Sequence, residues 1–134
     1  SGDPWQTEFY ARVGWHFPAP AGRGPVVCET GFNMGMSTVL WLTACDNCTV
    51  HSFDLCDRAG GQIGHRRLLR LYPGRLTLHC GNTTQTLPRL VANSTATGGL
   101  QCDILHIDGG HEYDAVASDF AHFQALAAPA GHVL

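Results

Sequence analysis

The chain contains no lysine, and this absence excludes several kinds of site. All eight basic residues are arginines, in a chain of 134 residues with a formal net charge of −3. Without lysine there is neither a P-loop lysine for nucleoside triphosphates nor a lysine for a Schiff base. The arginines form no basic stripe, so a nucleic-acid partner is not expected.

Charged residues and long apolar runs are also scarce. Charged residues make up 14% of the sequence and hydrophobic residues 44%. No apolar run approaches the roughly 20 residues that a membrane-spanning helix needs, so we expect a soluble, globular protein. The length predicts a single domain over residues 1–134, with a helix and loop over residues 1–25 and an α/β core over residues 26–134.

The chain also lacks the glycine pattern of dinucleotide-binding proteins. Residues 26–38, VVCETGFNMGMST, run from a β-branched stretch through a glycine-spaced turn into an apolar helix, as at the ligand-binding edge of an α/β sheet. In G-x-G-x-x-G the second glycine lets the backbone touch a pyrophosphate, and Asn33 stands at that position. The carboxylate of Glu29, at the strand end, repels anions and attracts cations. The turn therefore predicts a ligand with a positive amine and no phosphate.

Strands and helices alternate along the rest of the chain. Besides the strand that begins at Val26 and the helix that begins at Met36, the pattern predicts strands over residues 49–54, 75–80, 102–108 and from residue 132. It predicts helices over residues 4–13, 62–72 and 115–126, and a short helix that Pro88 breaks, followed by a polar loop over residues 93–99. This alternation indicates a doubly wound, mainly parallel Rossmann-like sheet with the strand order 3-2-1-4-5.

An acid ends the second predicted strand as well. Asp54 follows Glu29 by 25 residues, where a doubly wound fold places the carboxylate that accepts the ribose hydroxyls. The alternative is that Asp54 only forms the turn.

Three features resemble class I S-adenosylmethionine-dependent methyltransferases, in particular their small-molecule O-methyltransferase-like branch. They are E-x-G-x-x-x-G-x-S-T from Glu29 to Thr38, the acid Asp54, and residues 107–114, IDGGHEYD, which resemble I-D-G-x-H-x-Y and continue to Asp119. The resemblance implies S-adenosylmethionine as cofactor and a small-molecule hydroxyl as methyl acceptor. The cofactor-binding residues would then be Glu29, Gly31, Asn33, Gly35, Ser37, Asp54, Asn82 and Asp108.

The resemblance also suggests roles for these residues. Glu29 would orient the amino end of the cofactor, while Ser37 with Thr38 would bind its carboxylate or merely cap the helix. Asn82 stands where the family often has an aspartate near the adenine amino group, and its amide oxygen can accept the same hydrogen bond. Asn82 also heads a glycosylation sequon, and a glycosylated Asn82 could not line the pocket.

Asp108 and His111 are the predicted catalytic pair. Asp108 would hold a divalent metal such as Mg²⁺ that polarises the acceptor hydroxyl, and His111 would remove the hydroxyl proton. The alternative is that both residues stabilise the turn and cap the next helix. The family usually adds two strands after the fifth, which leaves open a cofactor-binding module without catalysis, a trimmed domain, or association of another copy along the open sheet edge. A nucleotide-binding oxidoreductase is a further alternative, which Glu29 and Asn33 disfavour.

The six cysteines leave the compartment undecided between secretory and cytoplasmic. Three of the four asparagines, Asn47, Asn82 and Asn93, head sequons, which hints at secretion and a glycoprotein. Ser1 and Gly2 resemble a cleavage remnant, so a targeting segment could have been removed. For C-x-x-C at residues 45–48 the alternatives are free thiols, a local disulfide, or a zinc or redox site, with His51 and Cys56 as further ligands. Three other cysteines, in or beside predicted strands, are expected to be free and buried: Cys28, Cys80 and Cys102.

Overall fold

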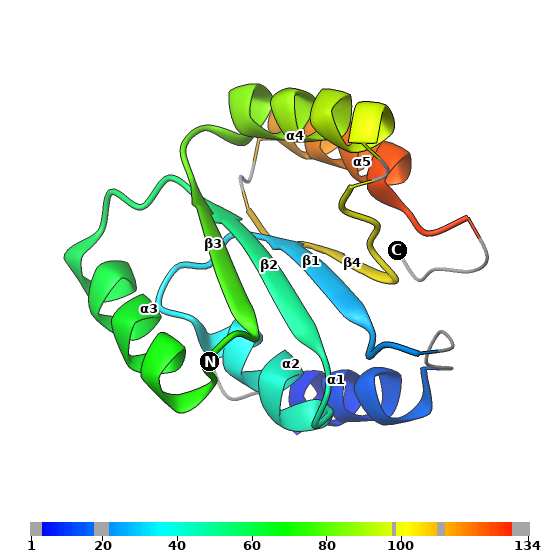
Figure 1. Ribbon diagram of the computed structural model, residues 1–134. Helices are drawn as coiled ribbons and strands as arrows, with labels where there is room; N and C mark the ends of the chain where they lie inside the picture. Colours follow the sequence, from blue (N-terminus) through cyan, green and yellow to red (C-terminus); the bar gives the residue numbers. More distant parts are fainter. Residues whose placement is uncertain (1–3, 18–21, 98, 110–111, 130–134) are drawn as a thin grey trace.

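The computed structural model describes residues 4–17, 22–97, 99–109 and 112–129. In these parts four parallel strands form one sheet in the order β3-β2-β1-β4 (Figure 1). The strands are β1 Val26–Thr30, β2 Thr49–Asp54, β3 Leu76–Cys80 and β4 Ile104–Ile107, and the helices are α1 Pro4–His16, α2 Met36–Ala44, α3 Ala59–Leu71, α4 Thr83–Thr97 and α5 Tyr113–Leu126. The doubly wound α/β fold and the order 3-2-1-4 are confirmed. The expected fifth strand, from residue 132, lies outside the described residues.

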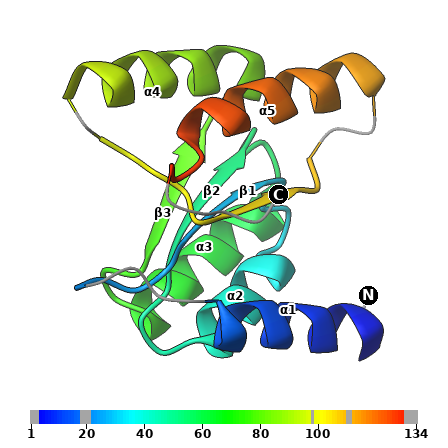
Figure 2. The same ribbon diagram turned by 90° about the vertical axis from the view of Figure 1, so that its right-hand side faces the viewer.

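Helices cover both faces of the sheet. Helices α1, α2 and α3 lie on one face and α4 with α5 on the other (Figure 2). Each face has its own core: one includes Val27, Trp41 and Ile104, and the other includes Phe53 and Phe123. In the described parts of the chain, no helix combines the length and hydrophobicity that a membrane crossing requires. Association along the open sheet edge stays a prediction.

The strand register places three polar residues in a row across the sheet. Glu29 of β1 pairs with Ser52 of β2 and with His106 of β4. Because side chains alternate between the two faces of a strand, all three lie on the face that α1 and α2 cover. Thr30, the next residue, points to the opposite face, toward α4 and α5.

The prediction for Pro88 is wrong. Helix α4 runs unbroken from Thr83 to Thr97 and contains Pro88, and residues 93–97 belong to it instead of a polar loop. A proline inside a helix removes one backbone hydrogen bond and costs about 3 kcal/mol. Here Leu87 is fully buried and Leu90 and Val91 pack against the same core, so tertiary packing outweighs that local cost.

The prediction that Cys28, Cys80 and Cys102 are free is also wrong. Cys28 pairs with Cys102, Cys56 pairs with Cys80, and Cys45 pairs with Cys48, which leaves no free cysteine. The first two pairs form because neighbouring strands bring together residues that are distant in sequence, with Cα atoms 5.8 and 5.4 Å apart. Cys80 is exposed, not buried. Of the alternatives for C-x-x-C, the structure selects the local disulfide.

A histidine pair predicts acid sensitivity. The Nδ1 atom of His51 lies 3.1 Å from Nε2 of His79, and burial followed by the charge of His79 lowers the pKa of His51 to about 4. The unfolded chain takes up this proton near pH 6.5 and the folded protein does not. The free energy of unfolding is therefore not reduced by His51 above pH 6.5. It falls as the pH drops toward 4, and the loss reaches about 2 kcal/mol at pH 5. Urea titrations at pH 7 and 5 measure this loss, and His51→Gln should reduce it; an equal loss in the variant would contradict the assignment.

Candidate active site

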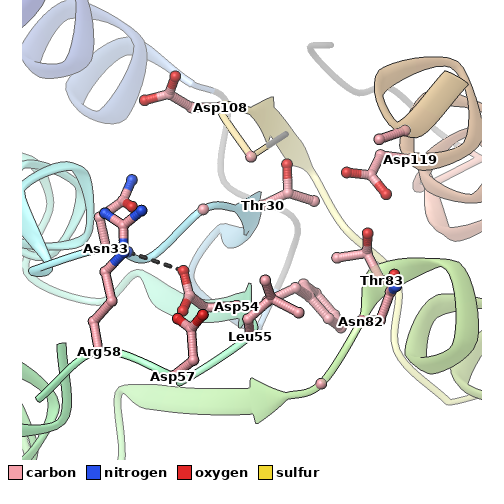
Figure 3. A pocket seen from close by; sticks show the side chains of 15 residues that line it. Thr30, Asn33, Asp54, Leu55, Asp57, Arg58, Asn82, Thr83, Asp108 and Asp119 are labelled. Carbon is pink, nitrogen blue, oxygen red and sulfur yellow. Dashed lines mark hydrogen bonds between the residues drawn. The ribbon is translucent and has the colours of Figure 1, made fainter. Parts of the chain in front are cut away.

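Two of the cavities at the carboxyl ends of the strands lie on either side of the turn after β1. One, of about 430 Å³ and named here the Asp54 cavity, extends under the loops after β1, β2 and β3 (Figure 3). The other, of about 460 Å³ and named the Ser37 cavity, lies between α1 and the N-terminus of α2. Gly31, Asn33 and Asp108 line both. One ligand can therefore extend across the turn from one cavity into the other.

The turn itself depends on glycine at two positions. Gly31 has φ +87°, and a Cβ there would overlap the backbone oxygen of Asp108. Gly35 also has φ +87°, and a Cβ would press on the ring of Phe32 and on Leu68. Both conformations are ones that only glycine adopts at little cost. Gly31 therefore allows the ends of β1 and β4 to meet at the shared wall of the cavities.

Asp54 has a carboxylate that the backbone holds in place. Its Oδ2 accepts a hydrogen bond from the N–H of Asn33 at 3.0 Å, which Figure 3 shows as a dashed line. Its Oδ1 accepts one from the N–H of Cys56 at 2.8 Å. Asn33 and Cys56 both have positive φ, of 50° and 60°. Each oxygen can accept a further hydrogen bond, and Asp54 lines the cavity, which suits two neighbouring hydroxyl groups.

Glu29 is fully buried and lines neither cavity. Its Oε2 accepts a hydrogen bond from Ser37 Oγ at 2.8 Å, and its Oε1 accepts from Ser52 Oγ at 3.0 Å and from Thr38 Oγ1. Neither Ser37 nor Thr38 caps α2, whose N-cap is Gly35. Because the Ser37 proton is committed to Glu29, the hydroxyl presents only lone pairs to the Ser37 cavity.

Tyr10 of α1 belongs to the same network, and the sequence did not point to it. Its hydroxyl lies 2.9 Å from Nε2 of His106, whose Nδ1 lies 3.7 Å from Oε2 of Glu29. A neutral His106 with its N–H at Nδ1, the tautomer that the carboxylate favours, accepts at Nε2 from the Tyr10 hydroxyl. Burial, with the charges of Asp108 and Glu29, raises the pKa of Tyr10 to about 12. Tyr10 therefore stays protonated and, like Ser37, offers an acceptor to the cavity it lines.

Asn82 lines the Asp54 cavity, but its oxygen has another partner. Oδ1 accepts hydrogen bonds from the N–H of Thr84 at 3.0 Å and from its hydroxyl at 2.8 Å, as an N-cap of α4 does. The amide NH₂ group is thus the part of Asn82 that is left for a ligand. This geometry disfavours the expected acceptance of a hydrogen bond from an adenine amino group.

The charge of the Asp54 cavity is predominantly negative. Among the described residues that line it, Arg58 is the only basic one, beside four acids: Asp54, Asp57, Asp108 and Asp119. Asp119 is buried next to Thr30 and Thr83 (Figure 3), and burial raises its pKa, against the opposing effects of the Thr83 hydroxyl and His122. Such a cavity disfavours phosphate groups and favours neutral or cationic ligands.

The predicted catalytic pair is only partly described. Asp108 is exposed at the wall between the cavities, whereas His111 lies outside the described residues. Within the described part of the chain, no group of three or more histidine, cysteine, aspartate or glutamate side chains could hold a metal ion. The structure therefore gives no support to a metal at Asp108.

Several of the residues predicted from the sequence line the two cavities. Five of them line the Asp54 cavity, Gly31, Asn33, Asp54, Asn82 and Asp108, and a sixth, Ser37, lines the other cavity. The sequence did not assign Tyr10, Leu55, Arg58 or Asp119 to the site. Of these four residues, only Asp119 could have been predicted from the sequence, because it continues the motif that begins at Ile107.

Comparisons with known proteins bear on this site. A family described as "Methyltransferase domain" matches residues 28–134, and no curated protein matches the chain. An O-methyltransferase family protein from Burkholderia thailandensis has a TM-score of 0.67 and 14% identity, over 97% of this chain and 36% of its own. A SAM-dependent methyltransferase from Agrobacterium tumefaciens has a TM-score of 0.71 and 14% identity, over 96% of this chain and 41% of its own. A SAM-dependent methyltransferase from Geobacter sulfurreducens, in complex with S-adenosyl-L-homocysteine, has a TM-score of 0.61 and 13% identity, over 98% of this chain and 47% of its own.

The structural likenesses concern the fold, because the identities are low. The chain spans between about a third and a half of these three proteins. The family match covers most of the chain, including the turn after β1, Asp54, Asn82 and Asp108. The chain belongs to the methyltransferase-domain family.

Proposed function

We propose that the domain binds S-adenosylmethionine and methylates a hydroxyl group of a small molecule. The observation that carries the proposal is the pair of cavities that share Gly31, Asn33 and Asp108. Their polar groups suit a nucleoside at one end and an amino acid at the other, with no phosphate between them. When bound, the cofactor supplies a methyl group activated by its sulfonium sulfur.

The Asp54 cavity suits the adenosine part. The two carboxylate oxygens of Asp54, each held by one backbone N–H, can accept the two hydroxyls of a ribose. Asn82 can donate from its NH₂ group to a ring nitrogen of the purine, since its oxygen caps α4. The exposed side chain of Leu55 can pack on the purine face.

The Ser37 cavity suits the amino-acid part. Ser37 and Tyr10 present hydroxyl lone pairs to it, and Asp108 adds a negative charge, so that a primary ammonium finds acceptors. The backbone N–H groups in the first turn of α2 can hold a carboxylate. We therefore assign Glu29 an indirect role: it orients Ser37 from behind instead of touching the ligand.

The lining of the Ser37 cavity also bears on the methyl acceptor. Asp108 is the only charged residue among its described lining residues, which otherwise include Phe32, Met34, Met36 and Leu40. A cavity whose described lining holds one acid and no basic residue favours a small, uncharged acceptor over an anionic one. Asp108 can align the acceptor hydroxyl by accepting its hydrogen bond, and alignment is the main requirement of methyl transfer. His111 remains a proposed base.

The proposal predicts cofactor affinity that depends on Asp54. S-adenosylhomocysteine should bind the wild type in isothermal titration, and Asp54→Ala should weaken binding about 50-fold because two charge-assisted hydrogen bonds are lost. Asp46→Ala is the matched control, since it removes an exposed carboxylate in the loop between α2 and β2. Equal affinities of the two variants would contradict the assignment of Asp54.

Three further outcomes separate the alternatives. Transfer of a radiolabelled methyl group from S-adenosylmethionine to a neutral phenol or alcohol would support the enzyme. Binding without transfer to any such hydroxyl compound would support a cofactor-binding module. Heat with NAD and none with S-adenosylhomocysteine would contradict the proposal and favour an oxidoreductase.

A further inference from the structure

The disulfide between Cys56 and Cys80 lies beside the proposed cofactor site. Cys56 follows Asp54 by two residues, and Cys80 immediately precedes Gly81 and Asn82, which line the Asp54 cavity. The strand register pairs Asp54 with Cys80. The bond therefore ties the loop after β2 to the end of β3, across the edge on which the ribose and purine would rest.

Cys56 also contacts Asp54 directly. Its N–H donates the 2.8 Å hydrogen bond to Oδ1 of Asp54, one of the two bonds that hold this carboxylate. The residue has φ +60°, a left-handed conformation that residues other than glycine rarely adopt. A covalent link at Cys56 keeps the backbone in this conformation, and with it the N–H that orients Asp54.

The three disulfides differ in how a reductant can reach them. Cys80 is exposed and Cys56 is half-buried, whereas Cys28 and Cys102 are both fully buried. Cys45 and Cys48 lie between α2 and β2, at the end of the sheet away from the cavities. The bond near Asp54 can thus be reduced while the bond inside the core stays intact.

We propose that the Cys56–Cys80 disulfide is a positioning element for cofactor binding, which acts through Asp54 and makes affinity dependent on the redox state. The proposal rests on the proposed function. A phosphine reductant supplies two electrons, the S–S bond breaks, two protons from water complete the thiols, and the phosphine becomes its oxide. The loop is then free to leave the left-handed conformation at Cys56, so Asp54 loses one of its two backbone donors.

The experiment is a titration of S-adenosylhomocysteine into oxidised and phosphine-reduced protein. Reduction of the wild type should raise Kd about tenfold, and the double variant Cys56→Ser/Cys80→Ser should show the same rise and no response to the phosphine. The control variant Cys45→Ala/Cys48→Ala should bind like the oxidised wild type and should still respond to reduction. If the serine variant does not fold, the test is the Kd of reduced wild type, measured on protein whose circular dichroism spectrum is the same as before reduction.

A second comparison separates positioning from general stabilisation. In the Asp54→Ala background, reduction should change Kd less than twofold, because the group through which the disulfide acts is already gone. A tenfold loss in that background, or an unchanged Kd in reduced wild type, would overturn the inference. If oxidised wild type does not bind S-adenosylhomocysteine at all, the proposed function itself fails, which distinguishes the two failures.

Discussion

Replacing Gly31 with alanine is expected to abolish cofactor binding and to remove at least about 3 kcal/mol of the stability of the domain. The new Cβ would overlap the backbone of Asp108 at a φ of +87°. The hydrogen bond from the N–H of Asp108 to Thr30 O, of 3.1 Å, depends on this approach, and the N–H of Gly31 also donates to Phe53 O of β2 at 2.8 Å. Moving Asp108 away would separate β1 from β4 and distort the wall that both cavities share.

Gly74→Ala provides the matched control for this variant. Gly74 also has a positive φ, of 75°, but a Cβ there would meet nothing within 4 Å. Its replacement therefore carries only the conformational cost, about 1 kcal/mol. Urea denaturation and titration with S-adenosylhomocysteine measure both variants. Equal stabilities would show that close approach at Gly31 is not what the turn requires.

Replacing Glu29 with alanine is expected to cost about 3–5 kcal/mol of stability. The carboxylate is the acceptor for the hydroxyl groups of Ser37, Thr38 and Ser52, of which Thr38 and Ser52 are fully buried. Alanine leaves these donors without a partner and opens a cavity at a residue that has no exposed surface. Glu29→Gln keeps one acceptor oxygen and should cost less.

Chemical denaturation measures this loss against Glu8→Ala. Glu8 is an exposed helix residue whose ion pair with Arg12 is open to solvent, so its replacement should change stability by less than about 0.5 kcal/mol. If Glu29→Ala were equally mild but bound S-adenosylhomocysteine poorly, Glu29 would act on the ligand and not as an anchor of Ser37. That result would favour the direct contact that the sequence suggests.

The parts of the site that the sequence predicted are local in the chain. A glycine turn after a strand and an acid at a strand end can each be read from a few neighbouring residues, and this is how Gly31 and Asp54 were predicted. Tyr10 could not be found in this way, because its role depends on α1 packing beside β4. The same holds for Asn82. Its oxygen caps α4 because that helix begins at Thr83, and the sequence did not show this helix start.

The cysteines and Pro88 illustrate the same limit for the fold. Pairing of Cys28 with Cys102 requires β1 and β4 to be neighbours, and the pairing of Cys56 with Cys80 requires β2 next to β3. The expected strand order implied both neighbourhoods, but not the positions of the sulfur atoms. At Pro88 a local rule predicted a break, and burial of Leu87 on the sheet outweighed it.

We expect the two cavities to hold one cofactor across the turn after β1. A crystal structure of the domain with S-adenosylhomocysteine tests this most directly. Both ribose hydroxyls should lie on the carboxylate of Asp54, and the ammonium group should lie beside Ser37 and Tyr10. A ligand bound elsewhere, or one whose ribose makes no contact with Asp54, would contradict it.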